Sequence, residues 1–303
     1  MDLEMQSERL QLSETIDFSR TISGMWKVIQ WNKSKQELLA FIEGCIDLGV
    51  TTFDHADIYG SYRAQQFFAE TLDLKPSLRD QIQLISKVGI KSLSDYRPNH
   101  LIKSYDSSKV HVLASVDHNL KALNTDYLDI LLIHRPDYLM NADELAETLQ
   151  NLYDSGRIKS IGVSNFSSKQ IELLQSRLSL PIMTNQIELS LTQTKYIDND
   201  HHFLLQQHSI SAMAWSPLAH GRIFNSSEYE TLYNELKQVA WELGTEADSL
   251  ALAWIMKLPI LVMPVVGTSR LEGIKAAVKA ESINMSHEQW YRLLQAAKGK
   301  PVI

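Results

Sequence analysis

Short apolar runs alternate with amphipathic segments along most of the chain. The apolar runs occupy residues 21–28, 50–53, 82–86, 128–133, 158–163, 182–187, 210–215 and 260–266. Each run is too short and too continuous for a strand with one exposed face, so the pattern predicts strands that are buried on both faces. Between the runs, apolar residues three and four positions apart predict helices over residues 35–48, 62–72, 109–123, 142–155, 168–177, 228–243 and 247–257.

This regular alternation of strands and helices indicates parallel βαβ units. Eight strands in 303 residues predict a closed (β/α)8 barrel of the TIM type, formed by a single domain over residues 1–303. A doubly wound open sheet is the structural alternative. No glycine-rich dinucleotide fingerprint follows any strand, and the chain has only 12 glycines, so the barrel is favoured.

Ionisable side chains follow three neighbouring strands at the point where each strand ends. Asp54 and Tyr59 follow the run at 50–53, Lys87 follows the next run, and His134 follows the one after that. Because the carboxyl ends of parallel strands meet at one end of a barrel, we expect these four side chains to converge there and to perturb one another.

The four residues suit the protonation of a carbonyl oxygen while hydride reaches the carbonyl carbon. A free tyrosine has a pKa of about 10, so it donates a proton well only when its phenolate is stabilised. Lys87 beside Tyr59 would stabilise the phenolate, and Asp54 would keep Lys87 charged and oriented. His134 would donate a hydrogen bond to the carbonyl oxygen.

With these residues, the chain resembles the aldo/keto reductase family over nearly its whole length. The likeness rests on the order and spacing of several motifs, namely Phe53-Asp54-His55-Ala56-Asp57-Ile58-Tyr59-Gly60, Ser86-Lys87, Leu132-Ile133-His134-Arg135-Pro136, Gly162-Val163-Ser164-Asn165-Phe166, Thr184-Asn185-Gln186, Trp215-Ser216-Pro217-Leu218 and Val266-Gly267-Thr268-Ser269-Arg270. The pattern is most similar to the bacterial branch of NADPH-dependent reductases with a short C-terminus.

The resemblance implies a role for each matching residue. The catalytic tetrad is Asp54, Tyr59, Lys87 and His134, with Tyr59 as general acid. The residues implied for cofactor binding are Ser164, Asn165 and Gln186 at the carboxamide, Trp215 stacked on the nicotinamide, Ser216, Leu218, Gly221 and Arg222 over the pyrophosphate, and Gly267, Thr268, Ser269 and Arg270 at the adenosine end. The Arg270 guanidinium favours NADPH over NADH, because it suits bidentate binding of the 2'-phosphate.

Three departures from the family pattern concern the cofactor and the catalytic strand end. His55 stands where the family has a small residue, Gly273 where a basic residue is expected, and Ala276 and Ala277 where a Glu-Asn pair contacts adenine. The effect of these departures on cofactor binding is open at the level of sequence.

The substrate pocket is expected to be open, because only six residues follow a predicted helix at 286–297. An open pocket predicts a broad range of small carbonyl substrates, namely aldehydes, ketones or quinones. Trp26, Trp31, Tyr62 and the loop at residues 90–108 are the candidates to line it.

Composition and charge narrow the class of protein. With 44% apolar and 21% charged residues, the chain is typical of a soluble globular protein. The net charge of -7 and the lack of a polybasic run argue against a nucleic-acid partner. The N-terminus lacks the features of a signal peptide, the apolar stretch at 250–266 is broken by Lys257 and two prolines, and the lone Cys45 forms no internal disulfide. We therefore expect a cytoplasmic protein with no membrane partner. The predicted surface helices are acidic and show no apolar stripe, so we expect a monomer.

Two other functions compete with carbonyl reduction. A metal-dependent hydrolase is suggested by His55-Ala56-Asp57 with His134, although no second histidine pair follows a later strand, so we expect no metal. An NADPH-binding redox sensor is the other alternative, since a fold does not fix a function.

Overall fold

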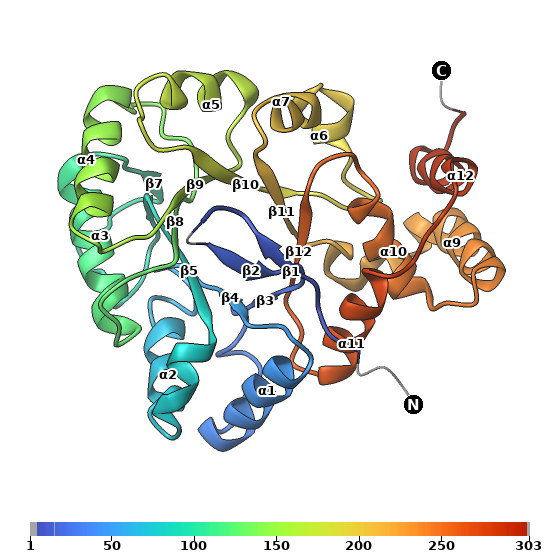
Figure 1. The fold of residues 1–303 in the computed structure, drawn as a ribbon, viewed down its shortest axis with the longest axis horizontal. Helices are drawn as coiled ribbons and strands as arrows, with labels where there is room; N and C mark the ends of the chain where they lie inside the picture. Colours follow the sequence, from blue (N-terminus) through green and yellow to red (C-terminus); the bar gives the residue numbers. More distant parts are fainter. Residues whose placement is uncertain (1–4, 15, 302–303) are drawn as a thin grey trace.

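Eight parallel strands close into a barrel in the computed structural model, which describes residues 5–14 and 16–301 (Figure 1). In order around the barrel they are β3 (Ile22–Gly24), β4 (Thr52–Asp54), β5 (Gln83–Val88), β8 (Ile130–Ile133), β9 (Ile161–Ser164), β10 (Ile182–Glu188), β11 (Ser211–Trp215) and β12 (Val262–Val266), and β12 pairs with β3 to complete the ring. The predicted barrel is confirmed, and the open sheet is excluded.

The helices surround the barrel. Those that match the predicted ranges are α1 (Lys35–Asp47), α2 (Ala64–Leu72), α3 (Lys109–Ala122), α4 (Ala142–Asp154), α5 (Ser168–Gln175), α9 (Glu230–Glu242), α10 (Ala247–Met256) and α12 (His287–Lys298). The pattern did not predict α6 (Lys195–Asp198), α7 (His201–Gln207), α8 (Arg222–Asn225), α11 (Leu271–Ala280) or the 3-10 turns η1 (Pro76–Gln81), η2 (Ala219–Gly221) and η3 (Ser227–Tyr229).

Several helices begin where a side chain satisfies their free backbone N–H groups. Ser34, Ser167 and Ser286 each form a capping box at the start of α1, α5 and α12, and Asn141 accepts hydrogen bonds from two backbone N–H groups at the start of α4. These caps fix where the helices begin relative to the strand ends that precede them.

An N-terminal hairpin covers the lower end of the barrel, which is the end where the strands begin. It consists of β1 (Arg9–Gln11) and β2 (Asp17–Ser19), which pair antiparallel and lie across the centre of the ring in Figure 1. Phe18 of this hairpin is fully buried and packs with Ile22, Ile130 and Met213 in an apolar cluster inside the barrel. The interior is therefore a packed core, as expected for eight strands, and a ligand site must lie at the opposite end.

A second apolar core lies between the strands and the outer helices. Close approach of neighbouring strands is possible at Gly162 of β9, where a Cβ atom would lie 2.6 Å from Leu132 Cδ2 and 2.9 Å from the Thr184 carbonyl oxygen. A side chain at this position would push β8 and β10 away from β9.

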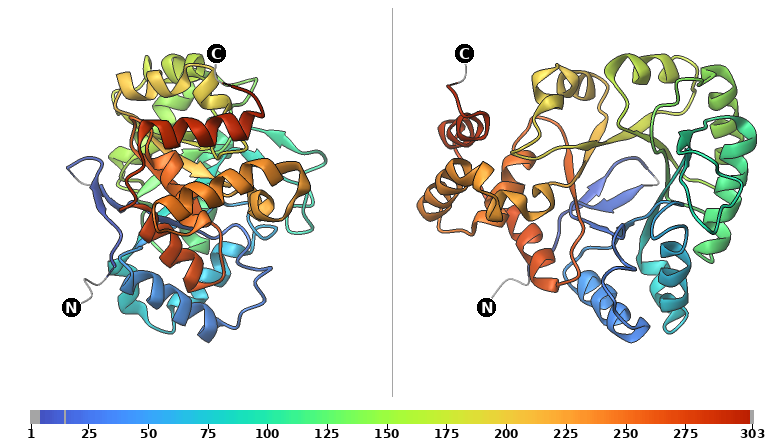
Figure 2. Two further views of the ribbon diagram at one scale, coloured as in Figure 1. Left: turned by 90° about the vertical axis from the view of Figure 1, so that its right-hand side faces the viewer. Right: turned by 180° about the vertical axis from the view of Figure 1, so that it is seen from behind.

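The C-terminal helix α12 packs beside α9 at the edge of the molecule, as Figure 2 shows from two sides. Its Trp290 stacks on Trp254 of α10 with ring centroids 4.7 Å apart, and each indole N–H donates to the backbone carbonyl of the other residue at 3.0 Å. This reciprocal pair joins α12 to the helices that flank the cavity described below.

The loop predicted at residues 90–108 contains a small hairpin of its own, β6 (Ile90–Lys91) with β7 (Ser104–Tyr105). Among the helices of residues 5–14 and 16–301, none is both long enough and apolar enough to cross a bilayer.

Candidate active site

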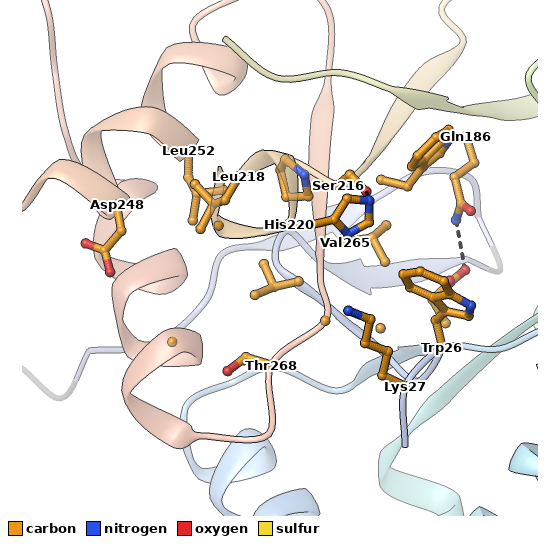
Figure 3. Close-up of a pocket in the computed structure, with 18 of the residues that line it drawn as sticks. Trp26, Lys27, Gln186, Ser216, Leu218, His220, Asp248, Leu252, Val265 and Thr268 are labelled. Carbon is orange, nitrogen blue, oxygen red and sulfur yellow. Dashed lines mark hydrogen bonds between the residues drawn. The ribbon is translucent and has the colours of Figure 1, made fainter. Parts of the chain in front are cut away.

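A cavity of about 890 Å³ opens at the carboxyl ends of the strands. This volume lies in the upper part of the range for small-molecule and cofactor sites. Figure 3 shows its length: Trp26, Lys27 and Gln186 lie at one end, and Asp248, Leu252 and Thr268 lie at the other. We refer to these as the catalytic end and the far end.

A buried ion pair forms the base of the catalytic end. The Lys87 ammonium lies 2.7 Å from both oxygens of Asp54 and 2.7 Å from the His55 carbonyl oxygen. Lys87 is fully buried and Asp54 is 2% exposed. The ammonium also lies 3.0 Å from the Tyr59 hydroxyl, so its protons are shared among four oxygen acceptors. Asp54 and Tyr59 line the cavity, whereas Lys87 lies behind them.

The electrostatics of this group keep the tyrosine protonated. Burial, together with the Asp54 and Asp57 carboxylates, raises the pKa of Tyr59 well above its ordinary value. Burial lowers the pKa of Lys87, and the Asp54 carboxylate opposes that shift. At neutral pH, the cavity therefore presents a phenol O–H whose oxygen is hydrogen-bonded to an ammonium group.

His134 lies next to Tyr59, directly after β8. The two rings meet edge to face with centroids 6.0 Å apart, and the His134 backbone N–H donates to the Val88 carbonyl. Burial, followed by the charge of Lys87, lowers the pKa of His134 well below its ordinary value. A neutral imidazole has one N–H to donate, which suits a hydrogen bond to a carbonyl oxygen in the cavity.

A chain of hydrogen bonds links the other predicted residues of the catalytic end to the ion pair. The Trp215 indole donates to Asn165 Oδ1 at 3.1 Å, and Asn165 Nδ2 donates to Ser164 Oγ at 2.7 Å. Ser164 Oγ donates to the Gln186 carbonyl at 2.9 Å, and Gln186 Nε2 donates to Asp54 Oδ1 at 2.8 Å (Figure 3). The ends of β9, β10 and β11 are thus tied to the end of β4.

The loop after β11 lies over the middle of the cavity. Ser216, Leu218, Gly221 and His220 line it, and Ser216 Oγ lies 2.9 Å from His220 Nε2. Arg222 is exposed, lies outside the cavity wall and donates weakly to the Ala219 carbonyl at 3.4 Å.

The segment after β12 forms part of the far end. Gly267, Thr268 and Arg270 line the cavity, and Ser269 lies outside its wall. The structure gives a reason for the glycine at 273: a Cβ atom there would lie 2.9 Å from Thr268 Oγ1. Gly273 and Ala276 also line the cavity, so the absence of large side chains widens the far end.

Of the three aromatic residues predicted for the substrate pocket, the structure brings one to the cavity. Trp26 lines it and is 49% exposed. Trp31 packs edge to face on Phe41 instead, with centroids 5.4 Å apart. Tyr62 is buried, and its hydroxyl accepts a hydrogen bond from the Ser92 backbone at 3.0 Å, because a left-handed turn at residues 60–62 directs the chain away from the mouth after Tyr59. The hairpin loop does reach the cavity, through Ile90 and Lys103.

His55 faces away from the cavity, toward α2. Its ring is fully buried and meets Phe68 edge to face with centroids 4.5 Å apart. Burial and the charge of Lys87 lower the pKa of His55 to about 3, so it is neutral at physiological pH. Residues 5–14 and 16–301 contain no group of three His, Cys, Asp or Glu side chains placed to hold a metal ion.

Several residues of the cavity wall were not predicted from the sequence. Arg135 lies at the catalytic end, and Glu246 and Asp248 lie at the start of α10 at the far end. Lys103 also lies at the catalytic end, but it belongs to the loop at residues 90–108 that was predicted to line the pocket. Arg135 directly follows His134 in the sequence, and this position was the one signal for it.

Comparison with known proteins identifies the family to which this chain belongs. The model of the aldo/keto reductase family matches residues 21–298. The chain is 44% identical to the uncharacterised oxidoreductase YcsN of Bacillus subtilis, over 96% of this chain and 98% of that protein. It is 42% identical to the oxidoreductase YdhF of Escherichia coli, over 94% and 96% of the two chains. It is also 38% identical to a 6-dehydroglucose reductase of Agrobacterium fabrum, over 97% and 99%. The chain is therefore a member of the aldo/keto reductase family of oxidoreductases.

Proposed function

We propose that this protein is an NADPH-dependent reductase that converts aldehydes, ketones or quinones to alcohols, with Tyr59 as the proton donor. The observation that carries the proposal is the hydrogen bond between the Tyr59 hydroxyl, in the cavity wall, and the buried Lys87 ammonium at 3.0 Å. Burial keeps the phenol protonated before the reaction. The adjacent ammonium stabilises the phenolate as the proton leaves, which allows the phenol to act as the acid.

The residues at the catalytic end have complementary roles in this proposal. Tyr59 gives its proton to the carbonyl oxygen, and the Lys87 ammonium stabilises the phenolate that remains. The neutral His134 donates a hydrogen bond to the same oxygen as negative charge develops on it. Asp54 keeps Lys87 protonated in a buried position, at 2.7 Å from both of its carboxylate oxygens.

The cavity fits a nicotinamide dinucleotide along its length. Asn165 and Gln186 offer amide groups near Tyr59, Trp215 offers an indole ring, and Thr268 and Arg270 lie at the far end. When bound, the cofactor supplies the hydride. We propose NADPH over NADH because the Arg270 guanidinium, which lines the far end, suits a 2'-phosphate.

The range of substrates follows from the open mouth, of which Trp26 is a half-exposed part. The relative at 38% identity is named for the reduction of 6-dehydroglucose. This name supports the inclusion of sugar-derived carbonyl compounds among the substrates to be tested. We further propose that the protein acts as a monomer in the cytoplasm, with no nucleic-acid or membrane partner.

The test is NADPH oxidation with a panel of aldehydes, ketones, quinones and sugar-derived carbonyls. Loss of a positioned general acid typically lowers the rate about 10²–10⁴-fold, so we expect Tyr59→Phe to lose activity by this factor. Tyr153→Phe is the matched control, because Tyr153 lies on the exposed side of α4, 39% exposed. NADPH binding without turnover of any carbonyl compound would contradict the proposal and favour a redox sensor.

A further inference from the structure

The charged side chains of the cavity are distributed unevenly along its length. Lys27, Lys103 and Arg135 line the catalytic end, while the carboxylates of Glu246 and Asp248 lie at the far end (Figure 3, where Lys27 and Asp248 are labelled). The carboxylate of Asp54 is the acidic group of the catalytic end, and it is already paired with Lys87. In a protein with a net charge of -7, this end of the cavity is therefore locally basic.

None of these three cations has an acidic partner. Within the described part of the chain, no carboxylate lies within ion-pair distance of Lys27, Lys103 or Arg135. The Arg135 guanidinium carbon lies 5.8 Å from the centroid of the Trp215 ring, at the catalytic end. Arg135 is half-buried and so is partly removed from solvent, whereas Lys103 is exposed on the hairpin loop.

The charges of both residues reach the reacting groups. Arg135 lowers the pKa of Tyr59 and of His134, and Lys103 lowers the pKa of His134. The carboxylate of Glu188 acts together with Arg135 on the pKa of Tyr196, and it also acts on the pKa of His220 in the cavity wall. Glu188 is not part of the cavity wall, so its carboxylate does not occupy the space that Arg135 faces.

We propose that the preferred substrates carry an anionic group, a carboxylate or a phosphate, which Arg135 binds with support from Lys103. This inference rests on the proposed function. A guanidinium binds either anion through two parallel hydrogen bonds, which fixes the orientation of the substrate as well as its affinity. The apolar side chains of Trp26, Ile58 and Ile90 line the same end and suit a short carbon chain or ring between the anion and the carbonyl.

The test compares substrates that differ only in the anionic group. The carboxylate arm uses 4-carboxybenzaldehyde against its methyl ester, and the phosphate arm uses glyceraldehyde 3-phosphate against glyceraldehyde. For the wild type, we expect kcat/KM to favour the anionic member by at least about tenfold in one arm or both, since charge-assisted hydrogen bonds are the strong ones. The arm with the preference identifies the anion.

Arg135→Met should abolish this preference. We expect KM for the anionic substrate to rise about 10–100-fold more than KM for the neutral substrate, because the anion contact holds the substrate equally in the ground state and the transition state. The neutral substrate reports the effect of the lost charge on Tyr59 and His134, so the ratio of the two kcat/KM values measures the anion contact. A circular dichroism spectrum like that of the wild type shows that the variant is folded. Lys75→Met is the matched control, since Lys75 is exposed and precedes β5, on the side of the barrel opposite to the cavity.

Two results would overturn the inference. One is a wild type that reduces the anionic and neutral members of both pairs equally well. The other is an Arg135→Met variant that loses activity on both members to the same extent, which would make Arg135 a structural residue. If the wild type reduces none of these compounds or those of the wider panel, the proposed function itself fails.

Discussion

The buried pair of Lys87 and Asp54 leads to a prediction about stability that does not depend on knowing the substrate. Their side chains are 0% and 3% exposed, with the ammonium 2.7 Å from the carboxylate. Asp54→Asn keeps the shape of the side chain and an oxygen acceptor for Gln186, but it removes the negative charge. The ammonium then stays buried with only the His55 carbonyl and the Tyr59 hydroxyl as strong partners.

We expect this substitution to lower the free energy of unfolding by about 3–5 kcal/mol, the usual cost of leaving one member of a buried pair without its partner. The measurement is equilibrium unfolding in urea, followed by tryptophan fluorescence. Glu43→Gln is the matched control, because the pair of Lys75 and Glu43 has the same distance of 2.7 Å but is 50% and 36% exposed. Its loss should cost less than about 1 kcal/mol.

The variant should also gain stability as the pH rises. Burial lowers the pKa of Lys87 in the folded protein below 10.5, and Asp54 opposes this shift, so its removal lowers the pKa further. At pH values between the pKa of Lys87 in the folded protein and its pKa in the unfolded chain, the unfolded chain binds more protons. The free energy of unfolding therefore increases with pH in this range. Unfolding in urea at pH 7 and pH 9 measures this difference.

A double variant completes the test. Asp54→Asn with Lys87→Met removes both charges and should recover most of the lost stability, because a buried pair replaced as a whole costs little. If Asp54→Asn destabilises the protein no more than Glu43→Gln does, or if the double variant is less stable than Asp54→Asn, the reasoning from burial is refuted.

Three further predictions concern other parts of the molecule. His55 has a pKa of about 3 in the folded protein, so below pH 6.5 only the unfolded chain binds its proton. The free energy of unfolding should therefore fall by about 1.4 kcal/mol for each pH unit below 6.5. Urea unfolding between pH 6.5 and pH 5 should show that His55→Thr removes this contribution to the slope. Gly162→Ala should cost about 1–3 kcal/mol through overpacking, measured as a lower Tm, whereas Gly267→Ala, whose Cβ would have no neighbour closer than 3.9 Å, should not. Arg270→Ala should weaken NADPH binding roughly 10–100-fold, because charge-assisted hydrogen bonds are lost, and should leave NADH binding unchanged. Fluorescence titration measures both affinities, and equal weakening of the two would contradict the role proposed for Arg270.

The barrel and the ends of its strands were predictable because both follow from local pattern. Each strand is a continuous apolar run, and the polar residue that ends it is visible in the sequence, as with Asp54 and Lys87. The hairpin of β1 and β2 was missed because three residues per strand are too few to show a period. Its burial depends on the barrel that it closes.

The less predictable parts of the site depend on contacts between distant segments. Trp26 and Trp31 lie in one loop and have similar chemistry, and only the packing of Trp31 on Phe41 of α1 separates them. Tyr62 is turned away by three successive left-handed residues, two of which are not glycine, so composition gives no warning of that turn. The hydrogen bond from Gln186 to Asp54 spans 132 positions in the chain, and no local pattern reports it.

The hairpin beneath the barrel also bears on the supply of protons. With Phe18 and its apolar neighbours filling the lower end, the ion pair of Lys87 and Asp54 has hydrocarbon below it and the cavity above it. On the proposed function, the proton that Tyr59 gives up must then be replaced through the opening by which substrate enters. A bound substrate blocks that route, so each reaction uses a proton stored on Tyr59 beforehand, and the tyrosine is recharged by solvent after the alcohol departs.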